Sequence, residues 1–188
     1  EINKHIKLSQ KELENLIADI DEAAYNRIME NRTVSEDEAK KTAEIVGLAA
    51  LKYGDLSNQA TKDYVFDIDR FTSFEGNTGP YILYTIVRIK SILKKFGQEI
   101  PTAITVPDGA AQKALMLDMT RFADVFAQAS AEYAPHKLCA YIYDLANDFN
   151  RFYHETKILA EEDQDKKKGY IALISYCKDI LETCIELL

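Results

Sequence analysis

Apolar side chains in this chain recur at three- and four-residue spacing, and strand-like alternation of apolar and polar residues is nowhere sustained. Spacing of this kind places side chains on one face of an α-helix. With 7 glycines and 4 prolines in 188 residues, few positions interrupt such helices. The sequence therefore predicts an all-α fold, built as a helical bundle.

Two four-residue sequences match the capping box that opens many helices: residues 9–12 (Ser-Gln-Lys-Glu) and 35–38 (Ser-Glu-Asp-Glu). In this motif the serine hydroxyl accepts a hydrogen bond from a first-turn N–H, and the acidic side chain reaches back to the serine N–H. We therefore expect helices to begin near Gln10 and Glu36. Gly54 is expected to end the second helix, because glycine favours the position that follows a helix. In the first helix, the apolar residues from Leu13 to Ile28 have core spacing.

Turn residues and charge runs divide the C-terminal half. Residues 97–109 contain two prolines and two glycines and predict a loop. A helix follows, and the residues expected to face inward are Leu115, Met119, Phe122, Val125 and Phe126. Pro135 is expected to open the next helix, because proline is tolerated in the first turn. The residues of that helix with apolar core spacing are Leu138, Tyr141, Ile142, Leu145, Phe149 and Phe152. Residues 161–168, acidic and then basic, predict a polar linker before a last helix that runs from Tyr170.

The most informative segment is a polar loop followed by an abrupt helix start, residues 74–84 (Phe-Glu-Gly-Asn-Thr-Gly-Pro-Tyr-Ile-Leu-Tyr). Gly76 and Gly79 permit backbone angles that other residues resist, so at least one of them should adopt a positive φ. Asn77 tolerates the left-handed region, and Pro80 suits the first helical position, where its missing N–H costs nothing. A loop this stiff should hold the side chains at the helix start in fixed positions.

The helix expected from Pro80 to Phe96 has two side-chain stripes. The apolar stripe consists of Ile82, Ile86, Ile89, Leu93 and Phe96, and the second stripe of Tyr81, Tyr84, Arg88, Ser91 and Lys95. At about 100° per residue the stripe centres lie roughly 150° apart. An aromatic and basic row near a helix N-terminus suits a nucleic-acid strand, because bases stack on rings and cations meet phosphates. Spacing alone favours the plainer alternative, in which both tyrosines pack at the margin of the core with hydroxyls in water.

The net charge of −8 is unusual for a protein that binds nucleic acid. The acidity lies mostly in residues 1–78, which hold 10 basic and 16 acidic side chains, against 13 and 15 in residues 79–188. The second half can therefore present a local basic face. Its expected members are Arg88, Lys90, Lys94 and Lys95.

The sequence contains no signal for secretion or for a membrane. No apolar run approaches the roughly 20 residues of a membrane span, and no secretory apolar region opens the chain. The three cysteines include no Cys-x-x-Cys pair, and Cys177 and Cys184, two helical turns apart, are expected to be buried free thiols. We expect a cytoplasmic protein with no membrane partner.

Residue patterns for catalysis or metal binding are missing from the sequence. No cysteine and histidine set has zinc spacing, no His-Glu-x-x-His occurs, and no serine or cysteine has a recognisable base. Asp67 and Asp69 are the residues that suggest a metal site, but two carboxylates without a third ligand are better explained as helix caps and solvated charges. We therefore predict no catalytic residue and no metal site.

Several segments, in order along the chain, resemble arginyl-tRNA synthetases. They are residues 46–58, 63–67 (Asp-Tyr-Val-Phe-Asp), 75–81 (Glu-Gly-Asn-Thr-Gly-Pro-Tyr), 135–138 and 149–154 (Phe-Asn-Arg-Phe-Tyr-His). The Gly-Asn-Thr-Gly-Pro-Tyr loop preceded by Tyr-Val-Phe-Asp is the most specific of these signals. The last helix looks like the final helix of that family's anticodon-binding domain, whereas residues 1–40 add only helical character.

The resemblance implies the helical bundle of a class I synthetase anticodon-binding domain over residues 79–188. Residues 1–78 would then join it to a catalytic domain. In that family the full-length enzyme uses ATP, with Mg, to attach arginine to arginine tRNA. The ATP-binding His-Ile-Gly-His-like and Lys-Met-Ser-Lys-like signatures are absent from these 188 residues, and the chain opens on Glu1. We therefore expect a C-terminal fragment that is monomeric, needs no cofactor of its own and is inactive alone.

The resemblance also implies which residues meet tRNA: Gly76, Asn77, Gly79, Tyr81, Tyr84, Arg88 and Tyr153. Tyr81 and Tyr84 would stack on or shape anticodon-loop bases. The loop residues would contact RNA, and Arg88 and Tyr153 would support this contact. Two alternatives stay open. One is the related helical module of a glycyl-type synthetase, against which the Tyr-Val-Phe-Asp and Gly-Asn-Thr-Gly-Pro-Tyr sequences argue. The other, favoured by the acidic balance, is a helical protein-interaction scaffold without RNA function.

Overall fold

The computed structural model describes residues 9–30 and 34–188, and in these ranges it contains eight α-helices, one short 3-10 helix and no strand. The all-α prediction is confirmed. Residues 1–8 and 31–33 of the predicted 1–78 segment lie outside the described residues. None of the described helices combines the length and apolarity needed to cross a membrane.

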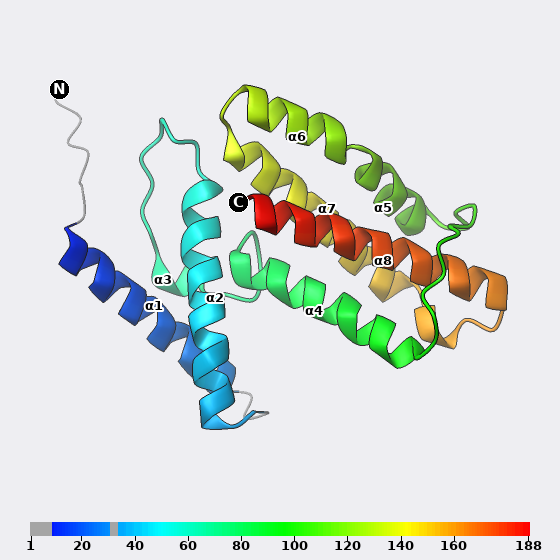
Figure 1. Cartoon of the computed structure of the whole chain (residues 1–188), viewed down its shortest axis with the longest axis horizontal. Helices are drawn as coiled ribbons and strands as arrows, with labels where there is room; N and C mark the ends of the chain where they lie inside the picture. Colours follow the sequence, from blue (N-terminus) through cyan, green and yellow to red (C-terminus); the bar gives the residue numbers. More distant parts are fainter. Residues whose placement is uncertain (1–8, 31–33) are drawn as a thin grey trace. The chain divides into compact units, whose positions relative to one another are not determined.

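The chain separates into two compact units. The first contains the described residues up to Asp55 together with Val65–Pro80, and the second contains Leu56–Tyr64 and Tyr81–Leu188. The first unit is built from α1 (Gln10–Glu30), α2 (Glu36–Leu56) and the one-turn α3 (Ile68–Phe71), shown in blue to cyan in Figure 1.

Both predicted helix starts in the first unit are confirmed, since α1 begins at Gln10 and α2 at Glu36. The Ser9 N–H donates to the Glu12 carboxylate at 2.7 Å, and the Glu12 N–H donates back to the serine hydroxyl at 3.3 Å. The Ser35 hydroxyl accepts from the N–H three residues later at 3.4 Å. Local sequence therefore determines these two starts, because each cap satisfies backbone groups that the helix itself leaves open.

One core cluster of the first unit consists of buried Ala24, Ala43 and Val46, against which Tyr25, Ile28 and Phe74 pack. Further buried side chains of this unit are Ile20, Ala39, Ala50, Tyr53 and Phe71. The expected core face of α1 was wrong at Leu13 and Ile17, which are both 41% exposed. Figure 1 shows the N-terminal end of α1 pointing away from α2.

The prediction that Gly54 ends α2 was wrong. The helix continues to Leu56, and Gly54 lies within its last turn. A Cβ at this position would lie 2.7 Å from Cδ1 of Phe71, whose ring stacks on Phe66 at 4.5 Å. The glycine is therefore needed for close ring packing against the helix rather than for a left-handed turn.

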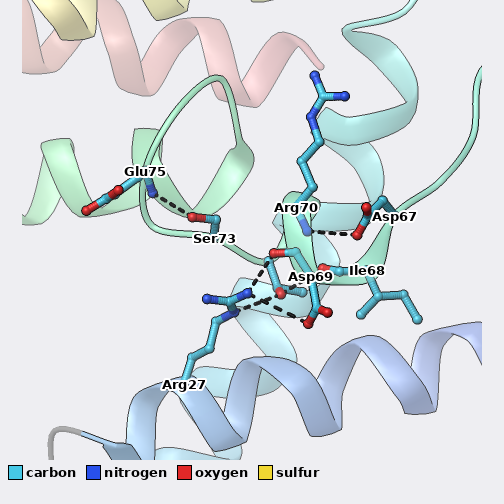
Figure 2. Close-up of polar contacts among 8 residues, drawn as sticks. Arg27, Asp67, Ile68, Asp69, Arg70, Ser73 and Glu75 are labelled. Atoms are coloured by element: carbon cyan, nitrogen blue, oxygen red, sulfur yellow. Dashed lines mark hydrogen bonds and ion pairs between the residues drawn. The ribbon is translucent and has the colours of Figure 1, made fainter.

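Helix α3 is held by a cap and by one arginine of α1. Asp67 caps α3 by accepting a hydrogen bond from the Arg70 N–H at 3.0 Å (Figure 2). Arg27 donates to the Asp69 carbonyl at 2.7 Å and to the Thr72 hydroxyl at 3.1 Å, and its guanidinium lies 3.8 Å from the exposed Asp69 carboxylate. The two carboxylates are thus a helix cap and a solvated charge, as the sequence indicated.

The second unit is a bundle of five helices and a 3-10 turn: α4 (Gly79–Phe96, whose first two residues belong to the first unit), α5 (Ala110–Thr120), α6 (Phe122–Ala131), α7 (Pro135–Glu155), η1 (Ile158–Ala160) and α8 (Gln164–Leu187) (Figure 1). Helix α7 contacts α5, α6 and α8. Helix α8 is buried on every side over residues 169–174. Cys177 and Cys184 are buried free thiols as expected, and Cys139 is also buried. Burial raises the pKa of the Cys139 and Cys184 thiols to about 12.

Two boundaries in the second unit differ from the sequence prediction. The helix expected over 115–126 is two helices that meet at Arg121, and Phe126 is 40% exposed rather than inward. The last helix begins at Gln164 instead of Tyr170. Asp163 accepts hydrogen bonds from two N–H groups of its first turn, and this cap moves the helix start into the charged run that had been assigned to a linker.

The loop before α4 uses its two glycines in different ways. Gly76 has φ of 80°, which confirms that one glycine of this loop adopts a positive φ, and open space surrounds the position of its missing Cβ. Gly79 has an ordinary backbone conformation, but a Cβ there would lie 2.2 Å from the carbonyl oxygen of Ala49 on α2. Gly76 is therefore needed for its backbone conformation, whereas Gly79 is needed for close packing against α2.

Gly79→Ala should destabilise the chain by roughly 1–3 kcal/mol, because the added methyl has to displace the backbone of α2. Gly76→Ala should cost about 1–2 kcal/mol through backbone strain alone. Gly76→Asn is the matched control and should cost less than Gly76→Ala, since asparagine tolerates the left-handed region. Urea unfolding of the three variants measures these differences, and a Gly79→Ala protein as stable as the wild type would contradict the packing explanation.

Candidate nucleic-acid interface

The two stripes predicted for α4 are present, with different degrees of burial. The apolar stripe is buried at Ile82, Ile86 and Ile89, and the neighbouring Ile92 joins it. Leu93 and Phe96, at the end of the helix, are half-buried. In the second stripe Tyr84 is 47% exposed, whereas Tyr81 and Arg88 are half-buried. The two tyrosines of one sequence stripe therefore lie in different surroundings.

Arg88 lies against two exposed tyrosine rings that come from different helices. Its Cζ atom is 4.8 Å from the ring centroid of Tyr84, one turn earlier on α4, and 4.8 Å from the ring centroid of Tyr153 near the end of α7. The guanidinium also donates to the Tyr84 hydroxyl at 3.1 Å. The rings are 47% and 37% exposed. We call these three residues the tyrosine–arginine stack, and cation–π attraction stabilises it.

Asn150 on α7 holds the Arg88 side chain of the stack in place. Its side-chain oxygen accepts a hydrogen bond from Arg88, and its side-chain nitrogen donates to the hydroxyls of Tyr81 at 3.0 Å and Thr85 at 3.1 Å and to the Ala146 carbonyl at 2.9 Å. Asn150 is only 8% exposed. A buried amide of this kind is costly unless both ends are bonded, so these contacts lock α4 and α7 together at this position.

Tyr81 belongs to the same network, and its side chain is half-buried. Its hydroxyl donates to the Asn147 side-chain oxygen at 2.8 Å and accepts from Asn150, and its ring meets Tyr143 edge-on at 5.9 Å between centroids. Burial raises the pKa of Tyr81, because the ionised form loses hydration there. Its hydroxyl is therefore bonded within the bundle, unlike the wet hydroxyl of the plainer alternative.

The structure brings together four of the seven residues predicted to meet tRNA. Tyr84, Arg88 and Tyr153 form the stack, and Tyr81 supports it through Asn150. The remaining three, Gly76, Asn77 and Gly79, belong to the loop of the first unit. There the Asn77 side-chain oxygen accepts a hydrogen bond from the Tyr53 hydroxyl at 2.7 Å, so this side chain helps to hold the loop to α2.

Asn150 is the residue of this arrangement that sequence reasoning missed. It occupies a buried position in the apolar period of α7, directly after buried Phe149. The available signal was this polar residue within an apolar face, since buried polar groups require specific partners. The basic face was also narrower than predicted, because Lys90 is bonded to Glu182 at 2.5 Å.

Residues 82–188, more than half of the chain, match the family described as "DALR anticodon binding domain", and residues 7–68 match "tRNA synthetases class I (R), catalytic domain". The chain belongs to the arginyl-tRNA synthetase family. The resemblance that the loop and the Tyr-Val-Phe-Asp sequence indicated is thereby confirmed.

Similar proteins agree with this assignment. The chain is 57% identical to the arginine–tRNA ligase of Agathobacter rectalis over 94% of its length, and 52% identical to that of Alkaliphilus oremlandii over 94%. It resembles the arginyl-tRNA synthetase structures of Thermus thermophilus (25% identity, TM-score 0.82) and Plasmodium falciparum (29%, 0.81), with 93% of the chain covered in each. It spans 32% and 30% of the two ligases and 30% and 32% of the two solved chains, about a third of each protein.

Tyr81→Phe and Tyr84→Phe should separate the structural tyrosine from the exposed one. Tyr81→Phe removes a donor to Asn147 and an acceptor from Asn150, so the free energy of unfolding should fall by about 1–2 kcal/mol. Tyr84→Phe loses one exposed hydrogen bond and should change stability by less than about 0.5 kcal/mol. Urea denaturation followed by circular dichroism measures both. Equal losses in the two variants would contradict the difference in surroundings.

Proposed function

We propose that this chain binds the anticodon stem and loop of arginine tRNA, as the C-terminal part of an arginine–tRNA ligase. The observation that supports this most directly is the tyrosine–arginine stack, in which two exposed rings and a guanidinium from α4 and α7 share one surface. Family membership supports the same function. Anticodon loops contain unpaired bases, and unpaired bases are what exposed rings and guanidinium planes recognise in RNA.

Each member of the stack has a separate task in this proposal. Tyr84 and Tyr153 stack on loop bases, and stacking of this kind contributes about 1–3 kcal/mol per base. Arg88 supplies a positive charge, and Asn150 orients its guanidinium before RNA binds. Less side-chain entropy is therefore lost on binding. Tyr81 shapes the surface through its hydrogen bonds, and Gly76, Asn77 and Gly79 form a loop that contacts RNA.

The full-length ligase, in this proposal, activates arginine with ATP and Mg and transfers it to the tRNA that this chain holds. Residues 79–188 act as the anticodon-binding domain and residues 1–78 join it to the catalytic domain. Arginine and ATP are therefore bound by residues that carry the ATP-binding signatures, which these 188 residues do not contain. The protein works as a monomer in the cytoplasm.

A helical scaffold for protein partners is the second candidate, favoured by the net charge of −8. A glycyl-type anticodon-binding module is the third, although the arginine–tRNA ligase relatives argue against it. Both alternatives make different predictions for tRNA selectivity. Binding of arginine tRNA, glycine tRNA and an unrelated tRNA, measured over a range of salt concentrations, distinguishes all three.

Tyr84→Ala and Tyr153→Ala should each weaken binding of arginine tRNA by roughly 1–3 kcal/mol, because each removes one stacking surface. The matched control is Tyr133→Ala, an exposed tyrosine of the same unit that precedes α7, whereas Tyr153 lies near the other end of that helix. The control should bind like the wild type. Fluorescence anisotropy gives the affinities, and a thermal melt of each variant checks folding.

Equal affinity for the three tRNAs, or no binding at all, would support the scaffold and contradict the proposal. Preference for glycine tRNA would favour the glycyl-type module. Wild-type affinity in both tyrosine variants, together with selective binding by the wild type, would place the RNA elsewhere on the chain.

This chain alone should form no arginyl-adenylate, since the ATP-binding signatures of the family do not occur in its 188 residues. Arginine-dependent exchange between ATP and pyrophosphate measures adenylate formation directly. Activity should stay at the background of a protein-free control. Exchange above that background that also requires arginine would show that the 188 residues contain a complete catalytic site.

A further inference from the structure

A groove of about 400 Å³ adjoins the tyrosine–arginine stack and has no assigned role. It lies where the C-terminal half of α4, the end of α7 and the turn η1 meet. Ile92 and Ile158, both buried, contribute apolar lining, and the exposed Lys95 and Lys157 are also among its lining residues. Tyr153 lines the groove as well as packing on Arg88, so stack and groove share one side chain.

The positive charge along this groove is not neutralised by the protein. Six other cations of the second unit have an acidic partner: Lys90, Arg121, Lys137, Arg151, Lys166 and Lys178 each lie within 3.0 Å of a carboxylate oxygen. Within the described residues neither Lys95 nor Lys157 forms an ion pair. The acidic residue at the end of α7, Glu155, accepts from Arg151 at 3.0 Å. The groove is therefore a site of local positive potential in an acidic protein.

We propose that this groove binds the ribose-phosphate backbone of the RNA strand whose base stacks on Tyr153. Lys95 and Lys157 contact its phosphates, and the apolar lining accommodates the face of a ribose. The inference rests on the proposed function, because Tyr153 is what connects the strand on the stack to the groove. It extends that function from base stacking to backbone binding, and assigns the latter to cations that have no structural partner.

The mixed lining favours a nucleotide over a simple anion. Phosphate binding needs positive charge, which the two lysines supply. Apolar walls do not contribute to the binding of a free anion, whereas a nucleotide presents phosphate and sugar surfaces together. Sites that bind single strands combine a basic groove with an aromatic ring on which bases stack. The ring of Tyr153 provides this stacking surface beside the groove.

The test uses the 188-residue chain and the anticodon stem-loop of arginine tRNA. Lys95→Gln, Lys157→Gln and the double variant remove charge while keeping a polar side chain, and Lys113→Gln is the matched control. Lys113 is exposed on α5 and, like the groove lysines, forms no ion pair within the described residues. Dissociation constants are measured by fluorescence anisotropy at a series of KCl concentrations.

Each single variant should bind roughly threefold more weakly, and the double variant about tenfold more weakly. The slope of log affinity against log salt should become shallower by about 0.7 for each single-strand phosphate contact that is lost. Lys113→Gln should leave both affinity and slope unchanged. Tyr84→Ala should weaken binding with an unchanged slope, since it removes stacking and no charge.

Three results would overturn the groove assignment, and they separate it from the proposed function. Wild-type affinity and slope in the double variant, with Tyr84→Ala still impaired, would remove the groove and leave the function standing. A slope change in Lys113→Gln as large as in the groove variants would mean diffuse charge attraction instead of a defined site. Failure of the wild type to bind the stem-loop would overturn both proposals.

Discussion

The hydrogen bonds of Asn150 are the interaction on which the exposed surface of the second unit depends. One buried amide joins the Arg88 guanidinium, two hydroxyls of α4 and a carbonyl of its own helix. Because an unsatisfied buried amide costs on the order of 1–3 kcal/mol, α4 and α7 are held in the single register that bonds both of its ends. That register determines which side chains of the two helices meet at the surface.

The surface that results combines order with exposure. Arg88 is bonded at its inner end and flanked by the rings of Tyr84 and Tyr153, so its position is set without RNA. The rings themselves remain 47% and 37% exposed. A long cationic side chain on an open helix would lose much rotamer freedom on binding, whereas this one has already lost it on folding.

Local sequence predicted the features that depend on local interactions. The capping boxes located the starts of α1 and α2, Pro135 located the start of α7, and the apolar period of α7 placed Leu138, Tyr141, Ile142, Leu145, Phe149 and Phe152 in the core, where all six are buried. Predictions that depend on long-range packing were less accurate. The backbone freedom of Gly54 predicts a helix end, whereas the ring of Phe71 that packs against it cannot be inferred from neighbouring residues.

By itself, the sequence determined the helical class, the starts of α1, α2 and α7, and the family, because periodicity, caps and the Gly-Asn-Thr-Gly-Pro-Tyr loop are properties of neighbouring residues. The tertiary structure decided the difference between the two tyrosines of α4. Tyr81 and Tyr84 have the same residue type on the same stripe, yet one is bonded to Asn147 and Asn150 and the other is exposed against Arg88. Their difference comes from what α7 places beside each of them, and contacts between residues more than 60 positions apart are formed only when the helices pack.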